Sequence, residues 1–338
     1  MSGTSPVVIS MGDPAGIGPE IILKAWAQRR QSGPLFACIG DIGTMGEYAR
    51  HLGLPAPVGI ETLAAAGATF PRALPVLASP VAISAPLIAG KPDPRHAATV
   101  KACIEAGVEH CLTGAALALV TAPIAKSVMY EAGFSFPGHT EFLAELTQNR
   151  PIPGTRGPAM MLAGGGLRVV LTSIHEPLAK AVANLSAARI EQIARLTHEA
   201  LKRDFGLDRP RLALAGLNPH AGENGSLGRE EIDIINPVAA RLRADGIAIT
   251  DALPPDTMFH AEARAGYDAA ICLYHDQGLI PVKTLDFHGG VNITLGLPIV
   301  RTSPDHGTAF DIAGKGVARA DSLLAALDAA AEIAGHRA

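Results

Sequence analysis

"PVVISMGDPAGIGPEIILKAWAQRR", residues 6–30, is the stretch that decides the fold. It begins with apolar, β-branched residues that are typical of a strand, and residues 19–30 show helical spacing with proline at the first helical position. The loop between them is rich in glycine and proline and therefore permits a tight turn. A strand, a short loop and a helix in this order form the repeating unit of α/β proteins with a parallel sheet.

The same unit recurs along the chain. Further strands are predicted for the apolar runs at 34–40, 116–122, 211–217, 247–250 and 269–274. Further helices are predicted for 93–114, for the segment that Ser186 opens, and for 322–337. "PAMMLAG" and "LRVVLTSI" flank the glycines at 164–166 and predict a hairpin. This alternation predicts an α/β fold with a largely parallel sheet, and the length favours two lobes that share chain crossings.

The composition excludes several classes of protein. The chain has 338 residues, of which 48% are hydrophobic, so disorder is excluded. A net charge of −4 and an aromatic content of 4% give no basis for binding nucleic acid or an anionic membrane. The four cysteines form no CxxC pair, and the first residues lack the pattern of a signal peptide. We therefore expect a cytoplasmic protein with reduced cysteines, which binds neither nucleic acid nor membrane.

Histidines follow three of the predicted strands. His175 comes after the second strand of the hairpin, His220 after the strand at 211–217, and His275 after the strand at 269–274. Ligands of open α/β sheets bind outside the carboxyl ends of the strands, and neutral imidazole is the commonest metal ligand. Three converging histidines would leave coordination positions open for a substrate. Each histidine alone also fits a structural role, and the spacings of 45 and 55 residues are not a metal-binding signature.

A second set of candidates is suited to anions. Lys283, Asn292 and Arg301 lie among apolar residues close to predicted strand ends, where the two cations can neutralise a phosphate. His139 and Thr140 stand at the start of a predicted helix, where backbone N–H groups can also hold a phosphate. The alternatives are surface ion pairs for the cations and simple helix capping for His139 and Thr140.

The loop "MGDPAGIGPE", residues 11–20, is a candidate for binding a phosphate or nucleotide through Gly12, Asp13, Gly16 and Gly18. It is neither a P-loop nor a GxGxxG motif, and an ordinary turn between strand and helix is the alternative. Spacing locates no Ser-His-Asp or Cys-His arrangement, so nucleophilic catalysis has no positive support.

Several motifs together identify a family. "GDPAGIGPE", "PGHTEFLAEL", "LNPHAGENGSLGREEID", "YHDQGLIPVKTLDF" and "GVNITLGLPIVRTSPDHGTAFDIAG" resemble the 4-hydroxythreonine-4-phosphate dehydrogenases of vitamin B6 biosynthesis. The resemblance runs from about residue 7 to the C-terminal helix. It implies the two-lobed fold of isocitrate and isopropylmalate dehydrogenases, which is not a Rossmann fold, with a cleft between the lobes. We expect residues 1–125 plus 290–338 to form the first lobe, and 126–289 the second, which makes the dimer contacts.

The resemblance also implies the reaction. A family member uses NAD and a divalent metal to oxidise 4-phosphooxy-L-threonine to 2-amino-3-oxo-4-phosphooxybutanoate, which decarboxylates to 3-amino-2-oxopropyl phosphate on the route to pyridoxine 5'-phosphate. By resemblance, the metal is held by His175, His220 and His275 in a site shared between the subunits of a homodimer. Zinc, cobalt, magnesium and manganese all remain possible metals, and NADP remains possible in place of NAD.

The resemblance assigns substrate binding to five residues, His139, Thr140, Lys283, Asn292 and Arg301. Asp256 and Asp276 are the candidates for the general base, and Asp276 fits better as a support for a metal-binding histidine. Alternatives within the same class are dehydrogenases of threonate or erythronate 4-phosphate, or of cyclic dihydrodiols. An alternative from another class is a phosphate acyltransferase on the same fold, which needs neither NAD nor a three-histidine metal site.

Overall fold

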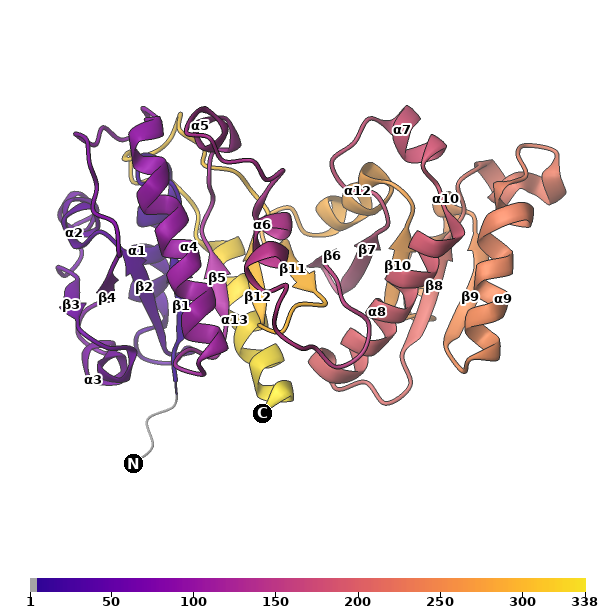
Figure 1. Ribbon diagram of the computed structural model, residues 1–338, viewed down its shortest axis with the longest axis horizontal. Helices are drawn as coiled ribbons and strands as arrows, with labels where there is room; N and C mark the ends of the chain where they lie inside the picture. The colour runs from indigo at the N-terminus through magenta and orange to yellow at the C-terminus, as the bar shows by residue number, and fades with distance from the viewer. Residues whose placement is uncertain (1–4) are drawn as a thin grey trace. The chain divides into compact units, whose positions relative to one another are not determined.

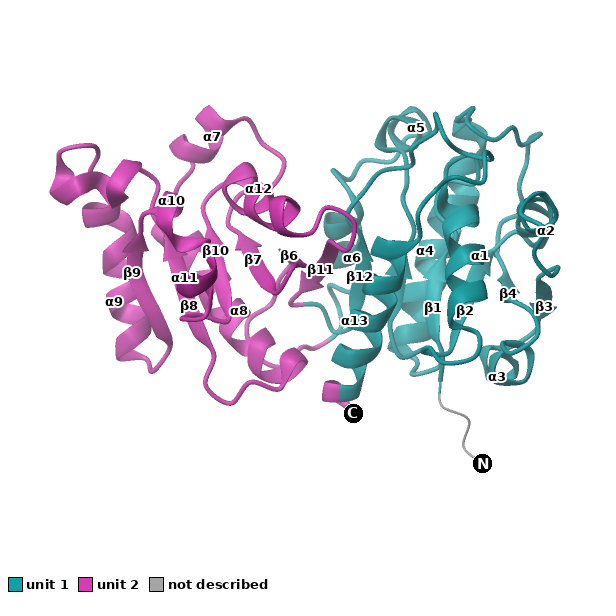
Figure 2. Cartoon of the chain, turned by 180° about the vertical axis from the view of Figure 1, so that it is seen from behind, with its two compact units in different colours: residues 1–150, 297–335 teal, residues 151–296, 336–338 magenta. Residues whose placement is uncertain are grey.

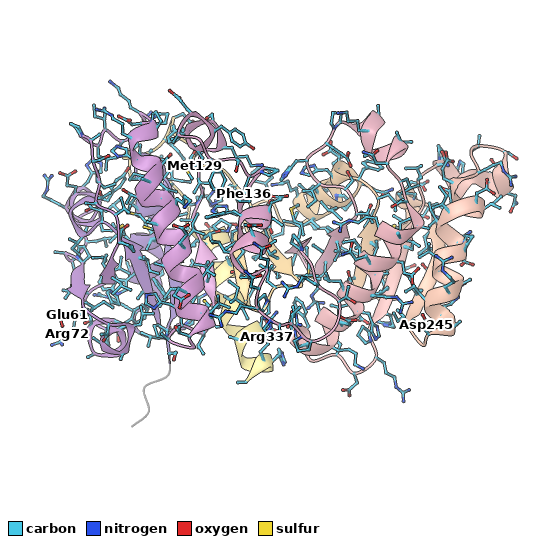
Figure 3. All side chains as sticks on the ribbon, viewed as in Figure 1. Glu61, Arg72, Met129, Phe136, Asp245 and Arg337 are labelled. Atoms are coloured by element: carbon cyan, nitrogen blue, oxygen red, sulfur yellow. The ribbon has the colours of Figure 1, made fainter. Side chains whose placement is uncertain are left out.

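The computed structural model describes residues 5–338, which divide into two compact units (Figure 2). Unit 1 comprises the chain up to Arg150 together with Leu297–Gly335, and unit 2 comprises Pro151–Gly296 with His336–Ala338. Residues 126–150 were expected in the second lobe and residues 290–296 in the first, but 126–150 belong to unit 1 and 290–296 to unit 2. Met129 and Phe136 (labelled in Figure 3) pack in the apolar core of unit 1 and hold 126–150 there.

The sheet of unit 1 contains six strands, and every strand pair in it is parallel. In their order across the sheet, these strands are β3 (Val58–Ile60), β4 (Pro75–Ala78), β2 (Phe36–Gly40), β1 (Val7–Ser10), β5 (Leu119–Thr121) and β12 (Arg301–Pro304). β1 and β2 are buried along their whole length, which explains why their sequences are continuous apolar runs.

Helices cover this sheet, and Figure 1 shows α4 crossing in front of β1, with which it is in contact. The helices of unit 1 are α1 (Gly18–Arg29), α2 (Ile42–His51), α3 (Ala66–Thr69), α4 (Ala97–Leu112), α5 (Lys126–Glu131), α6 (His139–Leu146) and α13 (Asp321–Arg337), with 3₁₀ turns η1 (Leu63–Ala65) and η2 (Pro94–His96). Asp41 caps α2, because its side chain accepts a 2.7 Å hydrogen bond from the backbone N–H of Thr44.

The sheet of unit 2 is mixed. In their order across the sheet, its strands are β11 (Val291–Leu295), β6 (Ala159–Gly164), β7 (Leu167–Leu171), β10 (Ala269–Cys272), β8 (Arg211–Ala215) and β9 (Ala248–Leu253). β6 runs antiparallel to both of its neighbours, and the other pairs are parallel. The predicted hairpin is confirmed: Gly165 and Gly166 have φ of 56° and 76°, which suits the tight turn between β6 and β7.

The helices of unit 2 are α7 (Leu178–Ala183), α8 (Ala187–Phe205), α9 (Asn236–Ala244), α10 (Pro255–Met258), α11 (Ala261–Arg264) and α12 (His275–Leu285), with the short helical turns η3 (Pro219–Gly225) and η4 (Glu231–Ile235). Ser186 caps α8 as predicted, by accepting a hydrogen bond from the backbone N–H of Arg189. Gly278 explains the glycine of "HDQG", because a Cβ there would lie 2.8 Å from Leu171 of β7. Because Gly278 has no Cβ, α12 can pack closely on the sheet.

Two further properties concern the residues that the structure describes. All four cysteines are free thiols. Between residues 5 and 338, no helix combines the length and the apolarity that crossing a bilayer requires.

Candidate active site

Two of the three predicted metal-binding histidines lie together in unit 2. β7 and β10 are neighbouring parallel strands, with Leu171 opposite Cys272, so both strands end at the same edge of the sheet. His175 lies in the segment that follows β7, and His275 is the first residue of α12 after β10. The centroids of the two imidazole rings are 5.8 Å apart, and the ring planes are inclined by 43°. The two rings are therefore close neighbours at the carboxyl edge of the sheet.

Buried hydrogen bonds hold both strand ends in place. The hydroxyl of Thr172, directly after β7, donates to the carbonyl of Leu273, directly after β10, at 2.8 Å. Gln277 is 6% exposed; its Oε1 accepts from the backbone N–H of Leu273 at 2.6 Å, and its Nε2 donates to the carbonyl of Gly216 after β8 at 2.7 Å. These bonds fix the ends of β7, β10 and β8 relative to one another, which pre-organises the loops that carry the histidines.

Asp276 supports His275. Its carboxylate Oδ1 lies 2.7 Å from Nδ1 of the neighbouring imidazole. A carboxylate at Nδ1 favours the tautomer that carries its proton there, and so leaves Nε2 available as a metal ligand. The support of a metal ligand by Asp276 stays a prediction.

A pocket of about 330 Å³ adjoins the two histidines. It is lined by residues 174–178, by Ala181 of α7 and by residues 274–276. Glu176 stands in this wall, where its carboxylate accepts hydrogen bonds from the Ser173 hydroxyl at 2.6 Å and from the Asn184 amide at 3.0 Å. The pocket therefore combines imidazole and carboxylate groups with apolar walls, as small-molecule sites do.

The third histidine, His220, lies apart from this pair. It is exposed and belongs to η3, which follows β8. Within residues 5–338, no three His, Cys, Asp or Glu side chains stand close enough together to hold a metal ion. Within a single chain, His175 and His275 are therefore neighbours, and His220 does not complete a three-histidine site with them.

The backbone around His220 is strained. The six consecutive residues from His220 to Gly225 all have positive φ, and four of them are not glycine. A left-handed turn costs L-residues roughly 1–2 kcal/mol each, so the surrounding structure must stabilise it. Strain of this kind concentrates at functional sites.

Glu231, which the sequence did not indicate as a functional residue, stabilises this turn. It is 1% exposed, and its Oε1 accepts 2.8 Å hydrogen bonds from the backbone N–H groups of Leu217 and Asn218. Its Oε2 accepts a further bond from the side-chain amide of Asn218 at 3.0 Å. Because Glu231 binds the segment between β8 and His220, it fixes where the left-handed turn begins. In the sequence, Glu231 stands in the charged run "GREEID", residues 228–233, and nothing in that run indicates that one of its carboxylates is buried.

Unit 1 contains three of the five predicted substrate-binding residues. Arg301 on β12 is 3% exposed, and its Nη2 donates a 2.6 Å hydrogen bond to the hydroxyl of Thr121 on the neighbouring strand β5. Burial lowers the pKa of Arg301 to about 9, which leaves the guanidinium charged at neutral pH. His139 begins α6, and its pKa falls well below the usual value through burial and the positive charges of Arg301 and Lys126. Thr140 follows in the same helical turn.

Unit 2 contains the other two. Lys283, which was expected close to a strand end, lies instead on α12, because the segment after β10 continues as a helix through this residue. Its ammonium is 5.5 Å from the ring centroid of Phe287. Asn292 lies on β11, and its buried Oδ1 has no hydrogen-bond partner in the part of the chain that the structure describes. A buried acceptor of this kind is costly unless a ligand or water satisfies it.

Asp256, the other candidate for the general base, lies in the first turn of α10, just beyond β9, and is exposed.

The loop after β1 packs tightly against its surroundings. Residues 11–20 are all buried, and Gly12, with φ of 75°, leaves no room for a Cβ beside the carbonyl of Pro123. Asp13 is 3% exposed and accepts a 3.0 Å hydrogen bond from the N–H of Ala15; burial raises its pKa. Gly16 packs against Thr308, and Gly18 packs against the carbonyl of Met11. The glycines thus serve close packing, and a cofactor role for this loop stays a prediction.

Comparison with known proteins agrees with the resemblance found in the sequence. Residues 36–330 match the family model described as pyridoxal phosphate biosynthetic protein PdxA. A 4-hydroxythreonine-4-phosphate dehydrogenase of Maricaulis maris is 68% identical over 100% of both chains. The crystal structure of 4-hydroxythreonine-4-phosphate dehydrogenase from Klebsiella pneumoniae superposes with a TM-score of 0.85 at 39% identity, covering 98% of this chain and 99% of that one. These matches confirm the predicted two-lobed α/β fold.

A more distant structure is similar as well. A terephthalate 1,2-cis-dihydrodiol dehydrogenase from Burkholderia xenovorans has a TM-score of 0.63 at 30% identity, and the match covers 95% of each chain. The same architecture thus occurs in a dehydrogenase whose named substrate is a cyclic diol.

Proposed function

Because the chain belongs to the PdxA family of pyridoxal phosphate biosynthetic proteins, and is therefore an oxidoreductase, we propose that it oxidises 4-phosphooxy-L-threonine. The product is 2-amino-3-oxo-4-phosphooxybutanoate, which then decarboxylates to 3-amino-2-oxopropyl phosphate. NAD is the expected hydride acceptor. The observation that carries the proposal is the convergence of His175 and His275 at the carboxyl edge of one sheet, with ring centroids 5.8 Å apart.

The donor groups of unit 2 fit a divalent cation. Two imidazoles stand side by side, and the carboxylate at Nδ1 of His275 leaves Nε2 for coordination. We assign the third position to His220 of the partner subunit in a homodimer, because one chain alone brings only two of the histidines together. Imidazole ligands favour zinc or cobalt, and oxygen ligands from substrate and water also admit magnesium or manganese.

The chain's own residues divide the work between binding and proton transfer. Arg301, His139 and Thr140 bind the phosphate ester, and Lys283 and Asn292 hold the polar groups at the other end of the substrate. Asp256 takes the proton of the substrate hydroxyl, since Asp276 is engaged with His275. When bound, the metal polarises that hydroxyl and stabilises the negative charge that develops on oxygen, and NAD accepts the hydride. The reaction takes place in the cytoplasm, where the four free thiols stay reduced.

A substrate panel tests this assignment. The enzyme is assayed for NADH formation with the 4-phosphates of hydroxythreonine, threonate and erythronate and with a cis-dihydrodiol, each with and without a chelator. We expect the highest kcat/KM for 4-phosphooxy-L-threonine, and loss of activity on chelation. Preference for the dihydrodiol would favour the function named for the Burkholderia xenovorans relative. Chelator-resistant acyl transfer to phosphate would favour the acyltransferase alternative.

The shared metal site is tested by subunit complementation. His175→Ala and His220→Ala chains are each expected to be inactive, and a heterodimer of the two restores one intact site out of two. Random mixing of equal amounts should therefore recover about a quarter of wild-type activity, because half of the dimers are mixed. If all three histidines acted within one chain, mixing would recover nothing.

The phosphate contact is tested with Arg301→Ala. Loss of a buried guanidinium that binds the phosphate should raise KM at least about a hundredfold. Arg319→Ala, which removes an exposed cation paired with Asp321, is the matched control. An unchanged KM in Arg301→Ala would exclude the contact.

A further inference from the structure

Lys126 lies beside the start of α6. It is the first residue of α5, and the chain returns from α5 to Gly138, the residue before His139. A Cβ built on Gly138 would lie 3.5 Å from Cε and 3.6 Å from Nζ of Lys126. The ammonium group therefore stands against the helix end that carries His139 and Thr140, although these residues are more than ten positions away in the sequence.

The charges around this helix end are unbalanced. The positive charges of Arg301 and Lys126 both act on His139, which is neutral at pH 7. Glu141 is the carboxylate at this place: its Oε2 is 3.5 Å from the same Cβ position, and its charge acts on Arg301. Two cations and one carboxylate leave a net charge of +1, which a bound anion would neutralise.

Hydrogen-bond donors are also available here. Gly138 is the N-cap of α6 and provides no capping side chain, so the first backbone N–H groups of the helix receive no hydrogen bond from a cap side chain and can bind an anion. Nε2 of His139 is buried and has no hydrogen-bond partner within residues 5–338. Lys126 itself is exposed, so its flexible ammonium group can reach a ligand at this helix end without a change in the backbone.

We propose that Lys126 is a further anion-binding residue, which contacts the phosphate ester of the substrate together with His139, Thr140 and Arg301. It sets the preference for a phosphorylated over an unphosphorylated hydroxy acid. This inference rests on the proposed function for the identity of the substrate, and on the cluster itself for the presence of an anion site.

The test uses Lys126→Ala and Lys126→Arg in the full-length protein, with Lys202→Ala as the control. Lys202 is an exposed lysine on α8 in the other unit, so its removal changes the net charge equally. Binding of inorganic phosphate is measured by calorimetry, and KM and kcat are measured with 4-phosphooxy-L-threonine. In Lys126→Ala we expect the Kd for phosphate and the KM to rise about tenfold with a smaller change in kcat, whereas Lys126→Arg stays close to wild type.

A third readout separates anion binding from a general structural effect. The pKa of His139, followed by NMR of its ring, should rise in Lys126→Ala, because a positive charge near the imidazole is lost. If phosphate binding and KM in Lys126→Ala equalled those of Lys202→Ala, the proposal would be overturned. If phosphate bound in a Lys126-dependent way but 4-phosphooxy-L-threonine were not oxidised, the anion site would stand and the proposed function would fail.

Discussion

Two glycine-containing loops follow parallel strands in this protein, and they differ in burial. The loop after β1, residues 11–17, is buried throughout. The loop after β8, which continues from Leu217 into η3, exposes His220, Glu223 and Asn224. The sequence indicates a candidate ligand site in both loops, because glycine and polar residues follow an apolar run in each.

The two loops also use their backbones differently. In the first, Gly12 alone has positive φ, and its missing Cβ permits close packing against Pro123. In the second, four non-glycine residues adopt positive φ, and Glu231 compensates by binding the backbone N–H groups in front of them. Glycine in the first loop serves packing, whereas the strain in the second presents a histidine to its surroundings. Burial and strain therefore distinguish a scaffold loop from a candidate functional loop, and glycine content does not.

The largest expected effect is that of His220→Ala. Loss of the proposed third metal ligand should lower kcat/KM by about three orders of magnitude, or about 4 kcal/mol, and should reduce the metal bound per subunit. Metal analysis and NADH formation measure the two effects. His51→Ala, which removes an exposed histidine at the end of α2, should change neither. Normal metal content in His220→Ala would show that the loop after β8 provides no metal ligand.

Alanine at one glycine of each loop compares the loops directly. In Gly12→Ala the new Cβ would meet the Pro123 carbonyl at 2.5 Å, so the free energy of unfolding should fall by about 3 kcal/mol. In Gly222→Ala it would meet Oε2 of Glu231 at 2.7 Å, so the turn should shift, with a stability loss of about 1 kcal/mol and a larger loss of activity. Urea unfolding and steady-state kinetics measure both. Equal effects in the two variants would contradict the distinction.

Glu231→Gln tests how the strained turn is held. Glutamine keeps an acceptor oxygen but loses the charge, so we expect a loss of about 1–2 kcal/mol in stability and a measurable fall in metal affinity. Asp233→Asn is the control, because Asp233 is exposed and forms an ion pair with Arg229 on the surface. Wild-type metal affinity in Glu231→Gln would show that the turn holds its shape without the charge.

The smallest effect is expected from Asp13→Asn in the buried loop. Burial raises the pKa of Asp13 from 3.8, so its charged form destabilises the folded state. This cost is absent below the pKa of the unfolded chain, grows as pH rises from that value to the folded-state pKa, and is constant above it. Asparagine should therefore stabilise the protein by about 1 kcal/mol at pH 7, and the gain should shrink on acidification. A loss of stability at pH 7 would show that the carboxylate is needed for packing of the loop.

Local structure in this protein follows closely from the sequence. The helix start at Ser186 and the hairpin at 164–166 were predicted, because each depends on residues within a few positions of one another. The antiparallel pairing of β6 with β11 was not predicted, because the partners are more than a hundred residues apart. The role of Glu231 and the proposed role of Lys126 were missed for a different reason: their neighbours are only 12–14 positions away, but no periodic pattern shows that the chain folds back to bring them together.

The sequence by itself determined the alternation of strands and helices, the family, and the histidines that follow β7, β8 and β10, because side-chain pattern and local backbone preference suffice for these. Only the tertiary structure decided that His175 and His275 meet while His220 stands apart on a strained turn, that 126–150 packs with unit 1, and that the loop after β1 is buried. The physical reason is that burial, charge proximity and strain depend on which distant segments pack together.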